Sequence, residues 1–280
     1  MIIDGRTLAQ EVLARAKARA ERLPHSPRVL GIVANETPAT LSYLSIKGKR
    51  ATDAGCIFDV QKFPEETNAI SLREAIASSD ADAIIVQLPL PNGIDARAVC
   101  DAIPTEKDAD ALSIAARTKF ERGDADALLP PVVAAVREIF MQGNVEVKGK
   151  HAVVIGNGWL VGNPCAAWLT QQGATVSVLT SQSGNLFDGA LPAGRQVRAA
   201  DIIISGTGSP HLIKPDMLKE GVVLIDAGTS ESGGALAGDA DPACAEKCSL
   251  FTPVPGGVGP IAVACLFENA VSLAERAMNS

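Results

Sequence analysis

Two hydrophobic patterns alternate along the first half of the chain. Apolar residues at helical spacing with charges between them predict amphipathic helices, whereas short continuous apolar runs predict buried strands. The predicted helices span residues 7–23, 40–54, 69–79 and 95–103, and the predicted strands span 28–34, 57–63 and 83–88. Helices that alternate with strands in this way predict parallel strand pairing through crossover helices.

The pattern restarts at Lys150 after an irregular stretch. Residues 104–110 predict a polar loop and residues 117–126 are charged without a clear period, before a predicted helix at 132–141. The second half then predicts strands at 151–155, 174–179, 201–205 and 222–226 and helices at 161–172 and 261–278. A strand–helix–strand unit followed by further short strands is typical of a doubly wound sheet. The join between the two halves is predicted near residues 142–149.

Length and composition agree with two α/β domains. The chain has 280 residues, and about 150 residues per domain gives roughly two domains. Its hydrophobic share of 47% excludes a disordered chain, and its aromatic share of 4%, with a single tyrosine at Tyr43, favours α/β layers over a β-sandwich. The formal net charge of −7 excludes a general nucleic-acid binder but leaves room for a local basic cluster that holds an anionic ligand.

The cysteines and the start of the chain predict a soluble, reduced, cytoplasmic protein. The six cysteines form no Cys-x-x-Cys pair and the three histidines are scattered, so no metal site is predicted and the thiols are expected to be buried or half-buried. No N-terminal segment combines a basic start, an apolar run and a cleavage site, and no apolar run approaches about 18 residues. Neither a secretion signal nor a membrane span is therefore expected.

A glycine-rich loop follows the predicted strand 151–155. It reads Gly156-Asn157-Gly158-Trp-Leu-Val-Gly162, which is GxGxxxG rather than the common GxGxxG. Rigid turns also use glycine, but this loop stands between a strand and a helix. There, glycines permit a tight turn and let backbone N–H groups approach a pyrophosphate. The sequence therefore predicts a dinucleotide-binding domain of the Rossmann type.

Other loops of this half bear on the cofactor. After the second strand, Thr180 and Ser181 stand where an acidic residue would bind a ribose hydroxyl or an arginine would bind a 2′-phosphate, so their hydroxyls suit either form. Glycine loops also follow the strand 201–205, as Gly206-Thr207-Gly208, and precede the last helix, within residues 252–260. Because ligands of open α/β sheets bind outside the carboxyl ends of strands, three such loops indicate a cofactor pressed against backbone.

Candidate catalytic side chains lie in the first half of the chain. Tyr43 and Lys47 are four apart on a predicted helix and share one face, although such a pair alone is more typical of packing and a solvated lysine. Gln87 ends an apolar strand, where its amide either reaches a ligand or caps the turn. The segment Lys107-Asp-Ala-Asp110 offers two carboxylates, or else a solvated surface turn.

Together these segments resemble one family nearly from end to end, the bifunctional methylenetetrahydrofolate dehydrogenase/methenyltetrahydrofolate cyclohydrolase enzymes. The most specific segments are Asp4-Gly5, Tyr43-x-x-x-Lys47, Val86-Gln-Leu-Pro-Leu-Pro91, Lys107-Asp-Ala-Asp110 and Thr252-Pro-Val-Pro-Gly-Gly-Val-Gly-Pro260. The resemblance implies oxidation of 5,10-methylenetetrahydrofolate with NADP, or with NAD, and hydrolysis of the methenyl product to 10-formyltetrahydrofolate. It also implies a catalytic domain of residues 1–142 completed by the helix 261–280, a Rossmann domain of residues 143–260, a substrate cleft between them, and a homodimer.

The resemblance also assigns roles to individual residues. Lys47 is the catalytic lysine, Gln87 its partner, and Asp110 the group that holds the pterin. The implied substrate contacts are Thr40, Tyr43, Pro255, Gly256 and Gly257, and the implied dinucleotide contacts are Gly156, Asn157, Gly158, Gly162, Thr180, Ser181, Gly206, Thr207 and Gly208. A lysine exchanges protons near neutral pH when burial or a nearby cation lowers its pKa, and an amide partner adds no charge that would raise it. An ionised aspartate is acceptor-only, which suits the N–H donors of a pterin.

The chain departs from the family pattern mainly on the cofactor side. Asn157 replaces the arginine of the cofactor loop, which removes a basic group expected to favour a 2′-phosphate. Ala111 replaces the usual glycine after the pterin-binding aspartate, and Ile261-Ala262 replaces Met-Thr. Three hypotheses stay open: the bifunctional enzyme, a monofunctional cyclohydrolase, and a catalytically silent folate- or nucleotide-binding protein, which the retained Lys47 disfavours. A dehydrogenase for another small substrate is disfavoured by the Gln-Leu-Pro-Leu-Pro segment.

Overall fold

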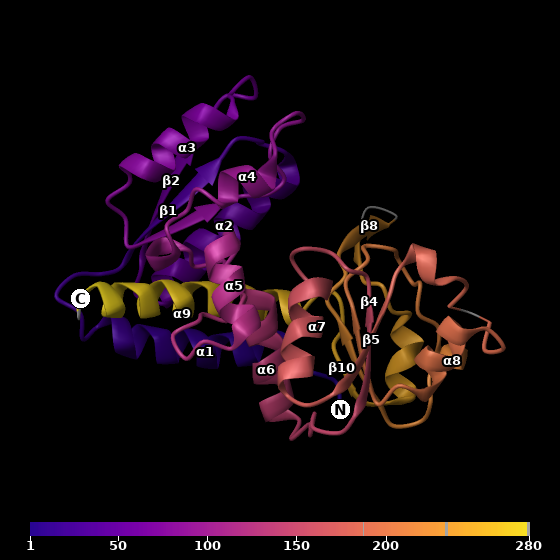
Figure 1. The fold of residues 1–280 in the computed structure, drawn as a ribbon. Helices are drawn as coiled ribbons and strands as arrows, with labels where there is room; N and C mark the ends of the chain where they lie inside the picture. The colour runs from indigo at the N-terminus through magenta and orange to yellow at the C-terminus, as the bar shows by residue number, and fades with distance from the viewer. Residues whose placement is uncertain (187, 233–234, 279–280) are drawn as a thin grey trace. The chain divides into compact units, whose positions relative to one another are not determined.

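The chain divides into two compact units, each with its own parallel sheet (Figure 1). The computed structural model describes residues 1–186, 188–232 and 235–278. Unit 1 comprises Met1–Leu8 and Val132–Ala262, and unit 2 comprises Ala9–Pro131 and Val263–Ser280. The predicted fold class, two α/β domains of which one has a doubly wound sheet, is confirmed.

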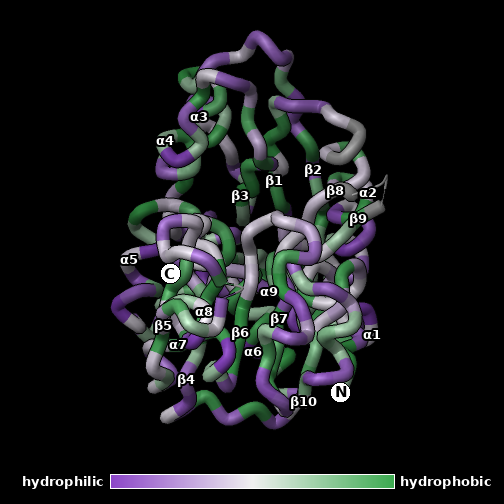
Figure 2. The backbone as a smooth tube through the Cα atoms, turned by 90° about the vertical axis from the view of Figure 1, so that its right-hand side faces the viewer, coloured by the Kyte–Doolittle hydropathy of each residue, from purple (hydrophilic) through white to green (hydrophobic). Residues whose placement is uncertain are grey.

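The sheet of unit 2 has three parallel strands in the order β2–β1–β3. The strands are β1 (Arg28–Val33), β2 (Ile57–Lys62) and β3 (Ala83–Val86), and the helices between and after them are α2 (Pro38–Asp53), α3 (Ala69–Ser78), α4 (Ala96–Cys100), η1 (Thr105–Lys107) and α5 (Ile114–Arg122). All four residues of β3 are buried, and the strand belongs to a hydrophobic stretch of chain in Figure 2. The predicted strands and the helices before them are thus confirmed to within a few residues.

Helix α5 corrects the sequence-based expectation for residues 117–126, which had shown no clear period. Ser113 caps its start by accepting a hydrogen bond from the backbone N–H of Ala116, and Gly123 ends it with a φ of 71°. Ala116 and Phe120 are the buried apolar residues of this helix. Two apolar positions within so short a helix are too few to produce a visible hydrophobic period.

Two helices complete unit 2 from the ends of the chain, α1 (Gly5–Ala20) and α9 (Val258–Met278). Arg15 pairs with Glu268 at 2.7 Å and Arg19 pairs with Glu275 at 2.5 Å, so these parts of the two helices run parallel. Among the described residues, α9 is the one helix long and apolar enough to cross a membrane, but 61% of its apolar window is buried inside the protein. That burial is what the core helix of a globular protein shows.

The sheet of unit 1 has five parallel strands in the order β10–β7–β6–β4–β5. The strands are β4 (His151–Ile155), β5 (Thr175–Leu179), β6 (Ile202–Ser205), β7 (Val222–Asp226) and β10 (Cys248–Phe251), and the helices are α6 (Pro131–Gln142), α7 (Gly162–Gln171), η2 (Ser181–Ser183), α8 (Pro192–Ala199), η3 (Pro215–Met217) and η4 (Pro242–Glu246). A small hairpin, β8 (Ser230–Ser232) and β9 (Ala235–Ala237), stands outside the sheet. Figure 1 shows α7 and α8 on opposite sides of the sheet. The chain reverses its direction across the sheet at β4 and β6, the position where open α/β sheets bind ligands.

The division of the chain differs from the predicted domain boundaries. Helix α6 falls in unit 1 almost entirely, because Phe140 packs on Trp168 of α7 with ring centroids 5.8 Å apart. The contact units thus divide the chain before this helix, and the predicted domain boundary after residue 142 stays a prediction. The first eight residues also join unit 1, because the backbone of Ile3 pairs with Phe251 of β10. Helix α8, strand β10 and the hairpin were not predicted.

Candidate functional site

Lys47 and Gln87 form a hydrogen-bonded pair in unit 2. Helix α2, which carries Lys47, is capped by Thr37, and Gln87 follows β3 directly. The ammonium Nζ of Lys47 donates to Oε1 of Gln87 at 2.9 Å, and Nε2 of Gln87 donates to the backbone carbonyl of Leu88 at 2.7 Å. The second bond fixes which end of the amide faces the lysine. The structure thus brings together two residues that lie 40 positions apart in the sequence.

The charge of Lys47 is poorly solvated. Burial lowers the pKa of its ammonium, and the nearby negative charge of Asp110 opposes this shift. Burial likewise raises the pKa of the Asp110 carboxyl, with Lys47 opposing the shift and Asp108 adding to it. Because burial disfavours the charged form of the ammonium, Lys47 gives up its proton more readily than a solvated lysine does.

The two aspartates of the predicted loop differ in their hydrogen bonds. The carboxylate of Asp108, 1% exposed, accepts hydrogen bonds from the backbone N–H groups of Leu112 and Ser113 at 3.1 and 2.7 Å, so it holds the start of α5. The carboxylate of Asp110 makes no hydrogen bond within the described part of the chain. Ala111, which follows it, has a φ of 52°, a backbone conformation that favours glycine. The position therefore keeps a glycine-like backbone despite its side chain.

Two further predicted substrate residues lie on the same helix as Lys47. Tyr43 precedes the lysine by one helical turn and is 40% exposed, so part of its side chain is open to a ligand. Thr40 is buried, and its hydroxyl lies 3.0 Å from the hydroxyl of the capping residue Thr37. The structure gives Thr40 a role in starting α2, and its predicted contact with substrate stays a prediction.

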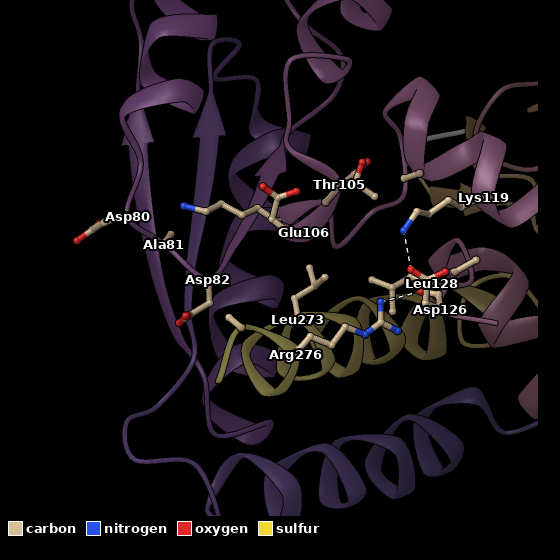
Figure 3. Close-up of a pocket in the computed structure, with 15 residues that line it drawn as sticks. Asp80, Ala81, Asp82, Thr105, Glu106, Lys119, Asp126, Leu128, Leu273 and Arg276 are labelled. Atoms are coloured by element: carbon tan, nitrogen blue, oxygen red, sulfur yellow. Dashed lines mark hydrogen bonds and ion pairs between the residues drawn. The ribbon is translucent and has the colours of Figure 1, made fainter. Parts of the chain in front are cut away.

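A hollow of about 560 Å³ in unit 2 lies away from these residues (Figure 3). It is lined by Asp80, Ala81, Asp82, Thr105, Glu106, Lys107, Asp108, Ala116, Lys119, Asp126, Ala127, Leu128, Leu273, Arg276 and Ala277. Figure 3 shows Lys119 and Arg276 directed at Asp126, and the Lys119–Asp126 ion pair measures 2.5 Å. The residues before β3 line the hollow, whereas Gln87 follows β3, so the two places lie at opposite ends of that strand. The hollow is therefore not the candidate site.

The first glycine loop of unit 1 combines two glycines that the fold requires with one that it does not. A Cβ on Gly162 would lie 2.0 Å from the carbonyl oxygen of Gly156, and Gly156 itself has a φ of 95°. A Cβ on Gly158 would meet no atom within 4 Å. No side chain caps the start of α7 at Val161. Open space at Gly158 and an uncapped helix start suit an anionic group pressed against the backbone.

The second loop of unit 1 and the turn after β5 are less open. A Cβ on Gly206 would lie 2.4 Å from the side chain of Val161, and Gly208 has a φ of 67°. Thr180 caps η2 by accepting a hydrogen bond from the backbone N–H of Gln182 at 3.3 Å, which engages one of the hydroxyls predicted to face a ribose. The hydroxyl of Ser181 is exposed. Residues 180–186 contain no lysine or arginine that would pair with a 2′-phosphate.

The proline-rich loop after β10 is hydrogen-bonded to the start of the chain. Gly256 has a φ of 105°, and its carbonyl accepts a hydrogen bond from the backbone N–H of Gly5 at 2.9 Å. A Cβ on Gly5 would lie 1.8 Å from the carbonyl oxygen of Gly257, which explains the Asp4-Gly5 segment sterically. These residues and Pro255 belong to unit 1, whereas Lys47 belongs to unit 2. Their joint contact with one substrate stays a prediction.

Sequence reasoning missed two buried carboxylates in unit 1, Asp226 and Asp239. An acidic residue at the end of the apolar strand β7, and another preceded by Gly238, were the available signals. The expectation of buried or half-buried thiols is confirmed, because five of the cysteines are buried free thiols and Cys248 is a partly exposed one.

Comparisons with known proteins agree with the predicted resemblance. Two family models match, the tetrahydrofolate dehydrogenase/cyclohydrolase catalytic domain over residues 3–110 and the NAD(P)-binding domain of the same family over residues 130–278. The bifunctional protein FolD of Nitrosospira multiformis is 36% identical over 286 residues, which cover 99% of this chain and 96% of that protein. The FolD of Methanococcoides burtonii is also 36% identical, over 98% of this chain and 96% of that protein.

Solved structures give the same result. The bifunctional enzyme FolD from Campylobacter jejuni superposes with a TM-score of 0.93 at 30% identity and covers 99% of both chains. The FolD of Trypanosoma brucei, solved with NADP and an inhibitor, superposes with a TM-score of 0.90 at 30% identity and covers 100% of this chain and 99% of that chain. With both of its domains matched, the chain belongs to the tetrahydrofolate dehydrogenase/cyclohydrolase family.

Proposed function

We propose that this protein oxidises 5,10-methylenetetrahydrofolate to 5,10-methenyltetrahydrofolate and hydrolyses that product to 10-formyltetrahydrofolate. The observation that carries the proposal is the Lys47–Gln87 hydrogen bond of 2.9 Å beside the carboxylate of Asp110. This arrangement places a lysine with a lowered pKa next to an acceptor that has no hydrogen bond in the described part of the chain. Membership of the family supplies the reaction to which this chemistry applies.

Lys47 handles the protons of the hydrolysis. When water attacks the methenyl carbon, a base must take its proton, and the ring nitrogen that leaves must receive one. The buried amine of Lys47 can do both in turn, because burial lowers its pKa and the positive charge of the methenyl group lowers it further. Gln87 holds the amine in place without adding a negative charge that would keep it protonated.

Asp110 and Tyr43 bind and orient the substrate. The carboxylate of Asp110 accepts hydrogen bonds and donates none when ionised, so it suits the amino and ring N–H groups of a pterin. The exposed ring of Tyr43 lies one helical turn from Lys47 and offers an apolar face for stacking. Together they place the one-carbon group of the folate near the lysine.

The glycine loops of unit 1 fit a nicotinamide dinucleotide. Gly158 leaves open space at the start of α7, where backbone N–H groups favour a pyrophosphate. When bound, the nicotinamide supplies the hydride acceptor for the oxidation. We propose NADP as the cofactor because the family resemblance implies it. NAD stays the alternative, because the turn at residues 180–186 carries hydroxyls but neither an acidic residue nor a cation. Asn157, Gly162 and Ser181 complete the proposed dinucleotide contacts.

We also propose a cytoplasmic homodimer. Six cysteines without a disulfide suit a reducing compartment, and the resemblance implies the dimer. Light scattering of the purified protein tests the dimer, and a molar mass of one chain would refute it.

Two assays of the purified protein test the function. The first supplies 5,10-methylenetetrahydrofolate with NADP or with NAD and measures the reduced dinucleotide, and the second supplies 5,10-methenyltetrahydrofolate and measures its hydrolysis. We expect activity in both assays. Hydrolysis without reduction of either dinucleotide would leave a monofunctional cyclohydrolase, and inactivity in both assays would leave a folate- or nucleotide-binding protein.

A further inference from the structure

Two buried carboxylates stand behind the second glycine loop of unit 1, and the mechanism above does not use them. Asp226 is the last residue of β7 and is 1% exposed, and Asp239 follows β9 and is 0% exposed. Neither forms an ion pair with a lysine or arginine among the described residues. Burying carboxylates without a cation is costly unless hydrogen bonds satisfy their oxygens. The oxygens of Asp226 and Asp239 therefore need hydrogen-bond donors from the surrounding chain.

Asp239 holds the loop after β6. Its Oδ2 accepts hydrogen bonds from the hydroxyl of Ser205 at 2.6 Å and from the backbone N–H of Thr207 at 2.7 Å. Its Oδ1 accepts one from the backbone N–H of Ser209 at 2.9 Å. One carboxylate therefore fixes every second residue of the segment 205–209. Hydrogen bonds to an ionised acceptor are stronger than neutral ones.

Asp226 in turn holds Asp239. Its Oδ1 accepts hydrogen bonds from the backbone N–H groups of Gly228 and Asp239 at 3.0 and 3.1 Å, and its Oδ2 accepts one from Ala240 at 2.8 Å. The backbone N–H of Asp226 donates to the hydroxyl of Thr252 at 2.7 Å. The two carboxylates thus link the loop after β6 to the segments that follow β7 and β9, and the backbone of Asp226 adds the link to Thr252 after β10.

Two glycines pack directly against these carboxylates. A Cβ on Gly228 would lie 2.2 Å from Cγ of Asp239, and a Cβ on Gly238 would lie 2.1 Å from Oδ2 of Asp226. Both glycines are therefore required for the carboxylates to approach the backbone. A side chain at either glycine would displace the carboxylate that it meets.

The hydrogen bonds of Asp239 also decide which backbone groups the loop presents. In a trans peptide, the carbonyl of one residue points opposite to the N–H of the next. Because the N–H groups of Thr207 and Ser209 point at Asp239, the carbonyls of Gly206 and Gly208 point away from it. The oxygen of Gly206 lies 3.0 Å from where a Cβ on Gly156 would stand, on the side of the first glycine loop. That side of the second loop therefore offers acceptors.

We propose, resting on the function proposed above, that Asp239, itself held by Asp226, is a positioning residue for the dinucleotide. It turns the carbonyl groups of Gly206 and Gly208 towards ligand groups that donate hydrogen bonds, the ribose hydroxyls or the carboxamide of the nicotinamide. The first glycine loop, with the uncapped start of α7, takes the phosphates. In this proposal the first loop donates hydrogen bonds to the phosphates, and the second loop accepts them from the ribose hydroxyls or the carboxamide.

The test is Asp239→Asn in the full chain, with Asp241→Asn as the matched control. Asparagine keeps the shape but offers one acceptor oxygen and adds an NH₂ group that faces donors. We expect the KM for NADP or NAD to rise at least about tenfold, while hydrolysis of 5,10-methenyltetrahydrofolate stays within about twofold of wild type. Asp241 lies two residues on, is paired with Lys214 at 3.1 Å, and should leave both activities unchanged when substituted.

A milder variant tests the same proposal if Asp239→Asn does not fold. Ser205→Ala removes one donor to Asp239 and keeps both backbone donors, so the KM for the dinucleotide should rise about two- to fivefold. An unchanged KM in a folded variant would overturn the proposal. So would a fall of both activities in equal proportion, because that is the result of a merely structural role.

Calorimetric titration of NADP and NAD into the wild type separates this proposal from the proposed function. If the wild type binds a dinucleotide but oxidises no folate, the proposed function fails, and weaker binding by Asp239→Asn still supports the positioning role. If the wild type binds neither dinucleotide, the positioning role is refuted. Equal affinity of wild type and Asp239→Asn refutes it while leaving the proposed function intact.

Discussion

Replacing Gln87 by glutamate tests the chemistry of the lysine most directly. The variant Gln87→Glu keeps the length of the side chain and places a negative charge 2.9 Å from Nζ of Lys47. A unit charge at that distance stabilises the ammonium by about 1.4 kcal/mol at the dielectric constant of water and by about 6 kcal/mol at an effective value of about 20. These energies correspond to a rise of about one to four units in the pKa of Lys47.

The hydrolysis rate should fall accordingly. Burial lowers the pKa of Lys47 in the native protein, and the added charge opposes that shift. We expect hydrolysis of 5,10-methenyltetrahydrofolate at pH 7 to fall at least about tenfold, and the pH–rate profile to move to higher pH by at least about one unit. The new glutamate stays ionised near neutral pH, because the lysine beside it lowers the carboxyl pKa.

A second substitution separates charge from geometry. Gln87→Met removes the hydrogen bond without adding a charge, so its hydrolysis rate should fall without a shift of the profile to higher pH. Initial rates over a range of pH, measured for both variants and wild type, provide the comparison. A profile of Gln87→Glu that superposes on the wild-type profile would refute the role of Lys47 as a group that must lose its proton.

Three further outcomes are expected. Lys47→Met should abolish methenyl hydrolysis while folate binding persists in a calorimetric titration, and Lys49→Met, an exposed neighbour, should leave hydrolysis unchanged. Gly158→Ala should keep the melting temperature of the wild type and raise the KM for the dinucleotide, whereas Gly162→Ala should lower the melting temperature, because its Cβ would lie 2.0 Å from a backbone oxygen. Burial raises the pKa of Asp226 to about 6, so the folded state binds this proton more tightly than the unfolded chain. Its contribution to the free energy of unfolding is present below about pH 4 and is lost as the pH rises through about 6, and Asp226→Asn should remove about 1–3 kcal/mol of that pH dependence in urea unfolding. Identical pH dependence in wild type and Asp226→Asn would contradict the last expectation.

The proposed dinucleotide-binding loops depart from the family pattern in their polar side chains but keep their glycine geometry. Asn157 supplies no positive charge, and the turn after β5 uses the hydroxyl of Thr180 to cap η2. The glycine geometry for the pyrophosphate is nevertheless intact at Gly156 and Gly162. The changes therefore bear on the choice between NADP and NAD more than on binding of a dinucleotide as such.

The sequence alone determined what depends on local spacing and sterics. Alternating hydrophobic periods predicted most strands and helices, and the glycine spacing after β4 predicted a tight turn between a strand and a helix. The spacing of Tyr43 and Lys47 placed them on one helix face, and the motif order indicated the family. The elements and the helix face are encoded within a few turns of chain, so the period of the pattern suffices to read them, whereas the family is read from motifs along the whole chain.

Only the tertiary structure decided which distant residues meet. It showed that Asp108 holds the turn before α5 while Asp110 lies by the lysine, although the two are separated by one residue. It also showed that Asp226 and Asp239 hold a loop that lies 30 or more positions earlier in the chain than Asp239. Contacts of this kind depend on how the strands order themselves in the sheet, and a one-dimensional pattern carries no record of that order. Burial then shifts the pKa values of Lys47, Asp110 and Asp226, because the charge of a carboxylate or an ammonium is stable only where neighbours replace its lost water.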